Sequence, residues 1–303
     1  MDIESVISEI RRVIKGKDEI IRYSLVCFFS GGHLLLEDVP GVGKTTLALA
    51  MAKALGLSFA RIQFTSDLLP SDIIGVSVYD QSKKSFTFKK GPLFNNLILA
   101  DEINRTTPKT QSALLEAMAE GKVSVDGITY ELPKPFFVIA TQNPVEQHGT
   151  YPLPESQLDR FSMKLSLGYP DPETEAQIIR GENPLESVER LKPVVKPQEV
   201  LSTMESIKRF YVSPEVSRLA VSIAQATRQS PKVLLGVSTR GLIHLINCAK
   251  ALAYIKERDF VVPEDIFELA PLCLAHRLIM REGTTGEEFI RQVVEELKLA
   301  VKF

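Results

Sequence analysis

The chain has 303 residues, which predicts a core of about 150 to 200 residues and a smaller second unit. Its 36 Lys and Arg residues against 38 Asp and Glu give a formal net charge of -2, which argues against binding nucleic acid through bulk electrostatics. Hydrophobic residues at 44% and charged residues at 24% are typical of a soluble globular protein. The charged N-terminus and the short apolar runs predict no secretory signal, no membrane span and a cytoplasmic location.

Residues 1–29 are expected to form two amphipathic helices that separate at 15–17, because apolar residues recur at helical spacing on both sides of that break. From 33 to 167 the pattern changes to short apolar strands separated by helical segments, which indicates a parallel sheet flanked by helices. The expected strands are 33–37, 58–64, 96–101 and 136–142.

Two segments interrupt this alternation with the signals of β-hairpins, at 75–91 and at 122–132, and the second turns at Asp126-Gly127. Beyond residue 170 the strand signals stop in a proline-rich, polar stretch, and after Gln198 every signal is helical. We therefore expect an α/β nucleotide-binding domain over 1–190 and a helical lid domain over 191–303.

Cysteines and histidines give no sign of a metal site. Each cysteine lies alone in an apolar helical stretch, which predicts buried structural thiols, and no histidine has a second ligand at metal spacing. These residues are Cys27, Cys248, Cys273, His33, His148, His244 and His276.

A phosphate-binding loop is expected between the strand 33–37 and the helix that follows it. Its glycines let backbone N–H groups close on the phosphates, Lys44 reaches the β and γ phosphates, and the Thr45 hydroxyl can ligate Mg²⁺. Asp38 stands where the outer glycine of the usual pattern would be, and a chance loop is the alternative interpretation. The expected nucleotide-binding residues are Asp38, Pro40, Gly41, Val42, Gly43, Lys44, Thr45 and Thr46.

Polar residues at the ends of the third and fourth expected strands complete this site. Asp101 and Glu102 follow the apolar strand 96–101, where Asp101 would hold Mg²⁺ through water and Glu102 would polarise the attacking water. Asn143 follows the strand 136–142 and could orient that water, although an asparagine that only caps a turn is the plainer alternative.

The runs GHLLLEDVPGVGKTTLA, QFTSDLLPSDIIG, ILADEINRTTPKTQSALLEAM, VIATQNPVEQHGTYPLPESQLDRF and GVSTRGLIHLI resemble the MoxR group of AAA+ ATPases. The resemblance extends over most of the chain. It implies a five-stranded parallel sheet in the order 5-1-4-3-2, hairpin insertions, an all-α lid and hydrolysis of ATP to ADP. Lys17 departs from the family, which more often has Gln there, and this leaves adenine recognition open.

The same resemblance implies that ATP binds between adjacent subunits of a homo-oligomeric ring, expected to be a hexamer. Arg160 matches the arginine finger that reaches the neighbouring subunit's γ-phosphate, and Arg240 matches sensor 2. An ion pair of Arg160 with Glu155 or Asp159 and a solvated Arg240 are the alternatives.

MoxR-like proteins imply a chaperone-like role, in which hydrolysis remodels, matures or activates a protein partner, often a von Willebrand factor A domain protein. No DxSxS segment of such a domain occurs here, so the partner would be a separate chain. A nucleotide-gated assembly scaffold with slow hydrolysis and a DNA-associated motor or restriction ATPase subunit remain open. The hairpin residues Phe86 and Phe88 and nearby lysines could grip a polypeptide or only protect a sheet edge.

Overall fold

The structure, a computed structural model, describes residues 1–145, 149–181, 183–281 and 283–301. Contacts divide the chain into two compact units. The first unit comprises Met1–Ile21, Leu35–Leu153 and Ser166–Leu201, and the second comprises Arg22–Leu34, Pro154–Leu165 and Ser202–Phe303.

A five-stranded sheet has the order β2-β5-β8-β1-β9, which in chain order reads 5-1-4-3-2 from the other edge and confirms the expected fold class. β2 pairs with β5 and β5 with β8 in parallel, and nearly every residue of β5 and β8 is buried, as in a sheet covered on both faces. The strands are β1 (Leu34–Glu37), β2 (Phe59–Gln63), β5 (Leu97–Asp101), β8 (Phe137–Gln142) and β9 (Met163–Leu165).

The two helices expected within residues 1–29 and the helix expected after the phosphate-binding loop are all present. α1 buries Ile3, Val6, Ile7 and Ile10 along one stripe, and the Asp2 side chain caps it by accepting a hydrogen bond from the Ser5 N–H. The helices are α1 (Ile3–Arg11), α3 (Lys44–Ala54), α4 (Pro70–Ile74), η1 (Ile103–Arg105), α5 (Pro108–Glu120), α7 (Pro172–Ile179) and α8 (Pro184–Val188); α2 (Asp18–Phe29) and α9 (Pro197–Lys208) each run from one unit into the other.

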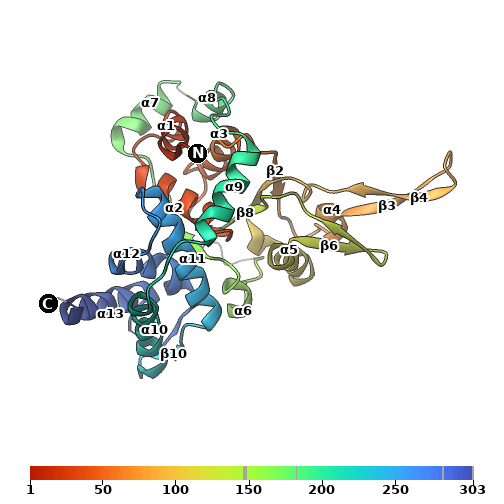
Figure 1. Cartoon of the computed structure of the whole chain (residues 1–303). Coiled ribbons are helices and arrows are strands. Elements are labelled where there is room, and N and C mark those ends of the chain that lie inside the picture. The colour runs from red at the N-terminus through yellow and green to blue at the C-terminus, as the bar shows by residue number, and fades with distance from the viewer. Residues whose placement is uncertain (146–148, 182, 282, 302–303) are drawn as a thin grey trace. The chain divides into compact units, whose positions relative to one another are not determined.

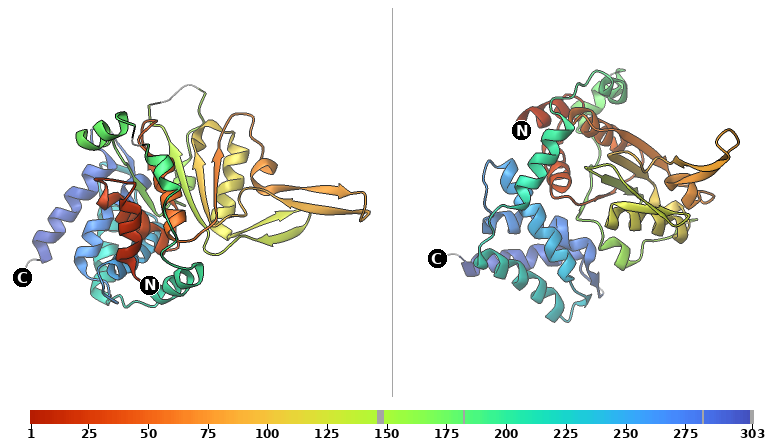
Figure 2. Two further views of the ribbon diagram at one scale, coloured as in Figure 1. Left: turned by 90° about the horizontal axis from the view of Figure 1, so that it is seen from above. Right: turned by 45° about the vertical axis from the view of Figure 1, so that its right-hand side comes forward.

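Both expected hairpins are present, one formed by β3 (Gly75–Asp80) and β4 (Ser85–Lys90), the other by β6 (Lys122–Val125) and β7 (Ile128–Glu131). They extend side by side from the sheet in Figures 1 and 2, and the rings of Phe88 and Tyr130 stack between them with centroids 4.2 Å apart. Each hairpin therefore buries part of an aromatic face against the other.

Helices dominate the second unit, as expected after Gln198, and α10 and α12 begin at Pro214 and Pro263, where proline is favoured. This unit also contains a short antiparallel pair, β10 (Val233–Leu235) with β11 (Ile279–Met280). Its helices are α6 (Glu155–Leu158), α10 (Pro214–Gln229), α11 (Thr239–Ile255), α12 (Pro263–Leu274), η2 (Ala275–Arg277) and α13 (Gly286–Val301).

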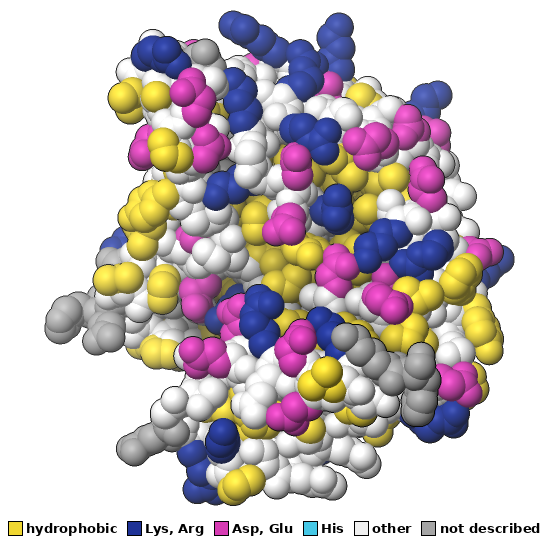
Figure 3. All heavy atoms as spheres, turned by 90° about the vertical axis from the view of Figure 1, so that its left-hand side faces the viewer, with side chains coloured by type: hydrophobic (Ala, Val, Ile, Leu, Met, Phe, Trp, Pro, Cys, Tyr) yellow, Lys and Arg dark blue, Asp and Glu magenta, His cyan; other side chains and the backbone are white. Residues whose placement is uncertain are grey.

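The three cysteines are free and buried, as the sequence predicts. Among the residues that the structure describes, no helix is long and apolar enough to cross a bilayer. Lysines and arginines are interspersed with acidic side chains on the face drawn in Figure 3, in keeping with the near-zero net charge.

Candidate active site

The segment between β1 and α3 has the backbone of an anion-binding loop. Gly41 and Gly43 have φ angles of 82° and 99°, in the left-handed region that side-chain-bearing residues rarely adopt. Gly43 caps α3 and has no side chain that could accept from the first N–H groups of that helix. These N–H groups and the helix dipole are therefore available to an anion.

The Lys44 ammonium is folded over this loop. Its Nζ donates to the carbonyl oxygens of Asp38, at 3.1 Å, and Val39, at 3.4 Å, and the neighbouring Thr45 is half-buried on the first turn of α3. A phosphate would attract Lys44 more strongly than these neutral carbonyls, because a phosphate oxygen carries negative charge that adds a Coulomb attraction to the hydrogen bond.

The buried Asp38 carboxylate holds the segment that follows β9. It accepts hydrogen bonds from Ser166 Oγ at 2.7 Å, from the Leu167 N–H at 2.6 Å and from the Gly168 N–H at 3.2 Å. Both carboxylate oxygens are engaged, and this accounts for an aspartate at a position where the usual pattern has glycine. Asp38 therefore fixes the start of the phosphate loop to the segment 166–168.

The acidic pair lies at the C-terminal end of β5 and is organised by Thr141 of β8. Asp101 accepts from Thr141 Oγ1 at 2.6 Å and pairs with Arg61 Nη2 at 2.6 Å, while Thr141 Oγ1 accepts the Glu102 N–H at 2.8 Å. Glu102 has a left-handed φ of 57°, a costly conformation that these contacts hold in place. Sequence reasoning did not identify Thr141 or Arg61; a threonine within an apolar strand was the available signal.

Glu102 and Asn143 both have local partners. The Glu102 carboxylate accepts from Gln63 Nε2 at 3.0 Å and lies 3.2 Å from Arg105 Nη1. Asn143 Oδ1 accepts from the Val145 N–H at 3.1 Å, which is the turn-capping contact, and its NH₂ group remains a donor. Parallel β5 and β8 end at the same edge of the sheet, which brings the acidic pair and Asn143 into one region.

A pocket of about 200 Å³ adjoins the phosphate loop and has a largely apolar lining. Sequence reasoning did not identify most of its residues, because they come from four separate segments of the chain. Lys17 lines it and donates to the Tyr169 carbonyl at 2.8 Å. The lining is Val13, Ile14, Lys15, Lys17, Gly41, Val42, Gly43, Thr46, Leu167, Pro170, Thr174, Ile178, Asn183, Pro184 and Leu185.

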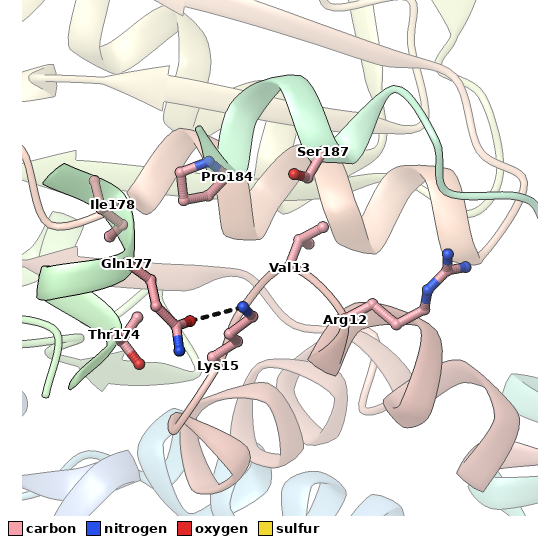
Figure 4. A pocket seen from close by; sticks show the side chains of 8 residues that line it. All are labelled: Arg12, Val13, Lys15, Thr174, Gln177, Ile178, Pro184 and Ser187. Carbon is pink, nitrogen blue, oxygen red and sulfur yellow. Dashed lines mark hydrogen bonds between the residues drawn. The ribbon is translucent and has the colours of Figure 1, made fainter. Parts of the chain in front are cut away.

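A smaller pocket shares part of this wall (Figure 4). In it Lys15 Nζ donates to Gln177 Oε1 at 2.8 Å, which joins the segment after α1 to α7. An apolar pocket with a few polar groups beside an anion-binding loop has the chemistry to hold the base and sugar of a nucleotide.

Residues Thr45 and Asp101 fit a magnesium site by donor chemistry. They offer a hydroxyl and a carboxylate, and Mg²⁺ bound with nucleotide phosphates takes few protein ligands and keeps several waters. The Arg61 guanidinium already provides Asp101 with a positive partner. Among the described residues, no three His, Cys, Asp or Glu side chains lie close enough together to hold a metal ion. His148 lies outside the described residues.

Arg160 and Arg240 both belong to the second unit. Arg160 is half-buried two residues after α6, and Arg240, with its side chain 58% exposed, lies on the first turn of α11. His244, one turn further along α11, lies 2.6 Å from Ser162 Oγ through Nδ1. Burial, with the nearby Arg277 charge, lowers the pKa of His244 to about 4, so its imidazole is neutral at pH 7.

Comparisons with known proteins agree with this geometry. Residues 33–163 match the ATPase family associated with various cellular activities (AAA), and residues 225–297 match the AAA lid domain. The uncharacterised protein YeaC of Bacillus subtilis is 47% identical over 98% of this chain and 94% of its own length. Chaperone MoxR1 of Mycobacterium tuberculosis is 40% identical over 96% and 79%.

A crystal structure of a candidate ATPase from Cytophaga hutchinsonii superposes with a TM-score of 0.87 and 42% identity. The similarity covers 99% of this chain and 94% of that one.

Proposed function

This chain belongs to the MoxR family of AAA ATPases, and from that premise we propose that it hydrolyses Mg-ATP at the subunit interfaces of a homo-oligomeric ring in order to remodel, mature or activate a protein partner. The ring is a hexamer and acts in the cytoplasm. The observation that carries this proposal is the uncapped N-terminus of α3, with Gly41 and Gly43 in left-handed conformations, in the same unit as the Asp101-Glu102 pair at the end of β5.

In this site the first N–H groups of α3 and Lys44 hold the phosphates of ATP. Thr45 directly and Asp101 through water would hold Mg²⁺, which would supply positive charge to neutralise the β and γ phosphates. Glu102 accepts a proton from the attacking water, and Asn143 orients that water through its NH₂ group. For Glu102 to act as the base, its carboxylate must leave Arg105 or share that contact with the water.

Two arginines extend the site beyond one subunit's phosphate loop. Arg160 acts as the arginine finger for the neighbouring subunit's γ-phosphate, and Arg240 acts as sensor 2 on the γ-phosphate of its own subunit. This assignment rests on their positions in the family's motifs and makes hydrolysis dependent on assembly.

The paired hairpins are the surface that we propose for the partner. Tyr79, Phe86 and Ile128 are exposed by 51%, 73% and 56%, and lysines such as Lys83 and Lys84 lie at the turn of the first hairpin. Exposed aromatic side chains beside cations can hold a polypeptide. The partner proposed is a separate von Willebrand factor A domain protein.

Replacing Lys44 by Ala tests the phosphate site. A hydrogen bond to a charged group contributes about 1.5–3 kcal/mol, so the variant is expected to bind ATP about ten- to a hundredfold more weakly by calorimetry. Lys53→Ala is the control, because Lys53 lies at the far end of the same helix and contacts Glu189 at 4.0 Å. Unchanged ATP affinity in Lys44→Ala would overturn the assignment of the loop.

A further inference from the structure

Arg277 in η2 is a buried arginine that the function described so far does not use. Only 4% of it is exposed, and its guanidinium makes four hydrogen bonds. Nε donates to the Cys273 carbonyl at 2.8 Å, Nη1 to both the carboxylate and the carbonyl of Asp159, and Nη2 to the Phe161 carbonyl at 2.5 Å. Three of these bonds end on the two residues that flank Arg160.

The chain around Arg160 is bonded to the rest of the second unit at further points. The Asp159 carboxylate also accepts from Ser238 Oγ at 2.9 Å, and Arg240 Nη1 lies 3.5 Å from it. Ser238 is the N-cap of α11, the helix that carries Arg240. The carboxylate of Asp159 thus joins the residue before Arg160 to the start of the Arg240 helix.

The Arg277 side chain occupies the space in which a side chain at position 241 would lie. A Cβ atom on Gly241 would lie 2.7 Å from Arg277 Cδ, closer than real Cβ atoms approach, and 3.2 Å from its Nε, which is a tight contact. The Arg277 side chain therefore passes against the backbone of α11, one residue after Arg240, on its way to Asp159. A glycine at this position follows from the path of Arg277.

From these contacts we infer that Arg277 is a positioning residue for Arg160. It fixes the backbone on both sides of Arg160 and, through Asp159, keeps Arg160 and Arg240 on one structural unit. This inference rests on the proposed role of Arg160 as a finger. As a consequence, a movement of the second unit that changes the contact of Arg240 with its nucleotide also moves Arg160, the arginine finger of the next subunit's site.

Replacing Arg277 by Gln removes the positive charge and two of the three side-chain nitrogens that donate hydrogen bonds. The expected result is a kcat at least about tenfold lower with ATP affinity unchanged, because a misplaced finger weakens stabilisation of the transition state and not of the bound ground state. Gly241→Ala, which displaces Arg277 without replacing it, is expected to lower kcat in the same way. Arg291→Gln is the matched control, since the side chain of Arg291 is 60% exposed and pairs with Glu287 at 2.7 Å on the same helix.

Mixing subunits separates positioning of the finger from damage to the lid. Glu102→Gln subunits cannot hydrolyse ATP but present an intact finger, whereas Arg277→Gln subunits keep Glu102. If Arg277 acts through the finger, a 1:1 mixture regains up to about a quarter of wild-type activity, because half of the sites are competent and half of these face an intact finger. If the mixture shows only the sum of the two residual activities, Arg277 acts within its own subunit and the inference is wrong.

The outcome for Arg160→Ala shows which idea has failed. Loss of kcat in Arg160→Ala with full activity in Arg277→Gln and Gly241→Ala would overturn the positioning role and leave the interface mechanism standing. Full activity in Arg160→Ala would overturn the proposed function itself. Circular dichroism and the melting temperature of each variant identify a protein that has failed to fold, in which case Gly241→Ala carries the test.

Discussion

Arg160→Ala is expected to assemble like the wild type and to hydrolyse ATP about 10³- to 10⁵-fold more slowly. The proposed physical reason is that the Arg160 guanidinium stabilises the negative charge that develops on the neighbouring subunit's γ-phosphate in the transition state. ATP binding is retained, because Lys44 and the first N–H groups of α3, which hold the phosphates in this proposal, belong to the first unit and are left unchanged. Steady-state turnover and equilibrium binding of ATP measure the two effects separately.

Arg218→Ala is the control for this substitution, because Arg218 also lies in the second unit and its 71% exposed side chain pairs with Glu215 at 3.0 Å. Its turnover should match that of the wild type. If Arg160→Ala loses less than about tenfold in kcat, a finger role is untenable, and an ion pair within the subunit becomes the better explanation of Arg160.

Glu102→Gln is expected to lower kcat by about 10² to 10⁴ while ATP still binds. The amide keeps the size of the side chain and can still contact Gln63 and Arg105, but it cannot accept a proton from water at neutral pH. Single-turnover hydrolysis with saturating ATP isolates this step from product release.

Glu120→Gln is the control, since Glu120 is the last residue of α5 and its half-exposed side chain lies 4.0 Å from Lys122 Nζ. Equal single-turnover rates for Glu102→Gln and the wild type would show that another group activates the water. The general-base assignment would then be withdrawn, although the phosphate site could still be correct.

Much of the fold was predictable from sequence because the long elements have clear periodicity. The four expected strands match β1, β2, β5 and β8 to within one residue at each end, and both hairpins lie within the expected segments 75–91 and 122–132. The shortest elements were not located. β9, β10 and β11 have two or three residues each, too few to show an alternating pattern.

The residues of the candidate site were likewise predictable only where a local sequence pattern marks them. Its loop, its acidic pair and Asn143 follow directly from strands, so their positions could be predicted from chain order. Residues that act through distant contacts could not. Arg277 meets Asp159 across 118 positions, and Asp38 meets Leu167 across 129, with no local pattern to mark either pairing.

The most direct test of the central claim is the ATPase rate per subunit measured across a range of protein concentrations, with mass photometry on the same samples. We predict that the rate per subunit rises over the concentration range in which rings form, because a complete site needs a neighbour's Arg160. A rate per subunit that stays constant while the protein passes from monomers to assemblies would contradict the account, since hydrolysis would then take place within one subunit.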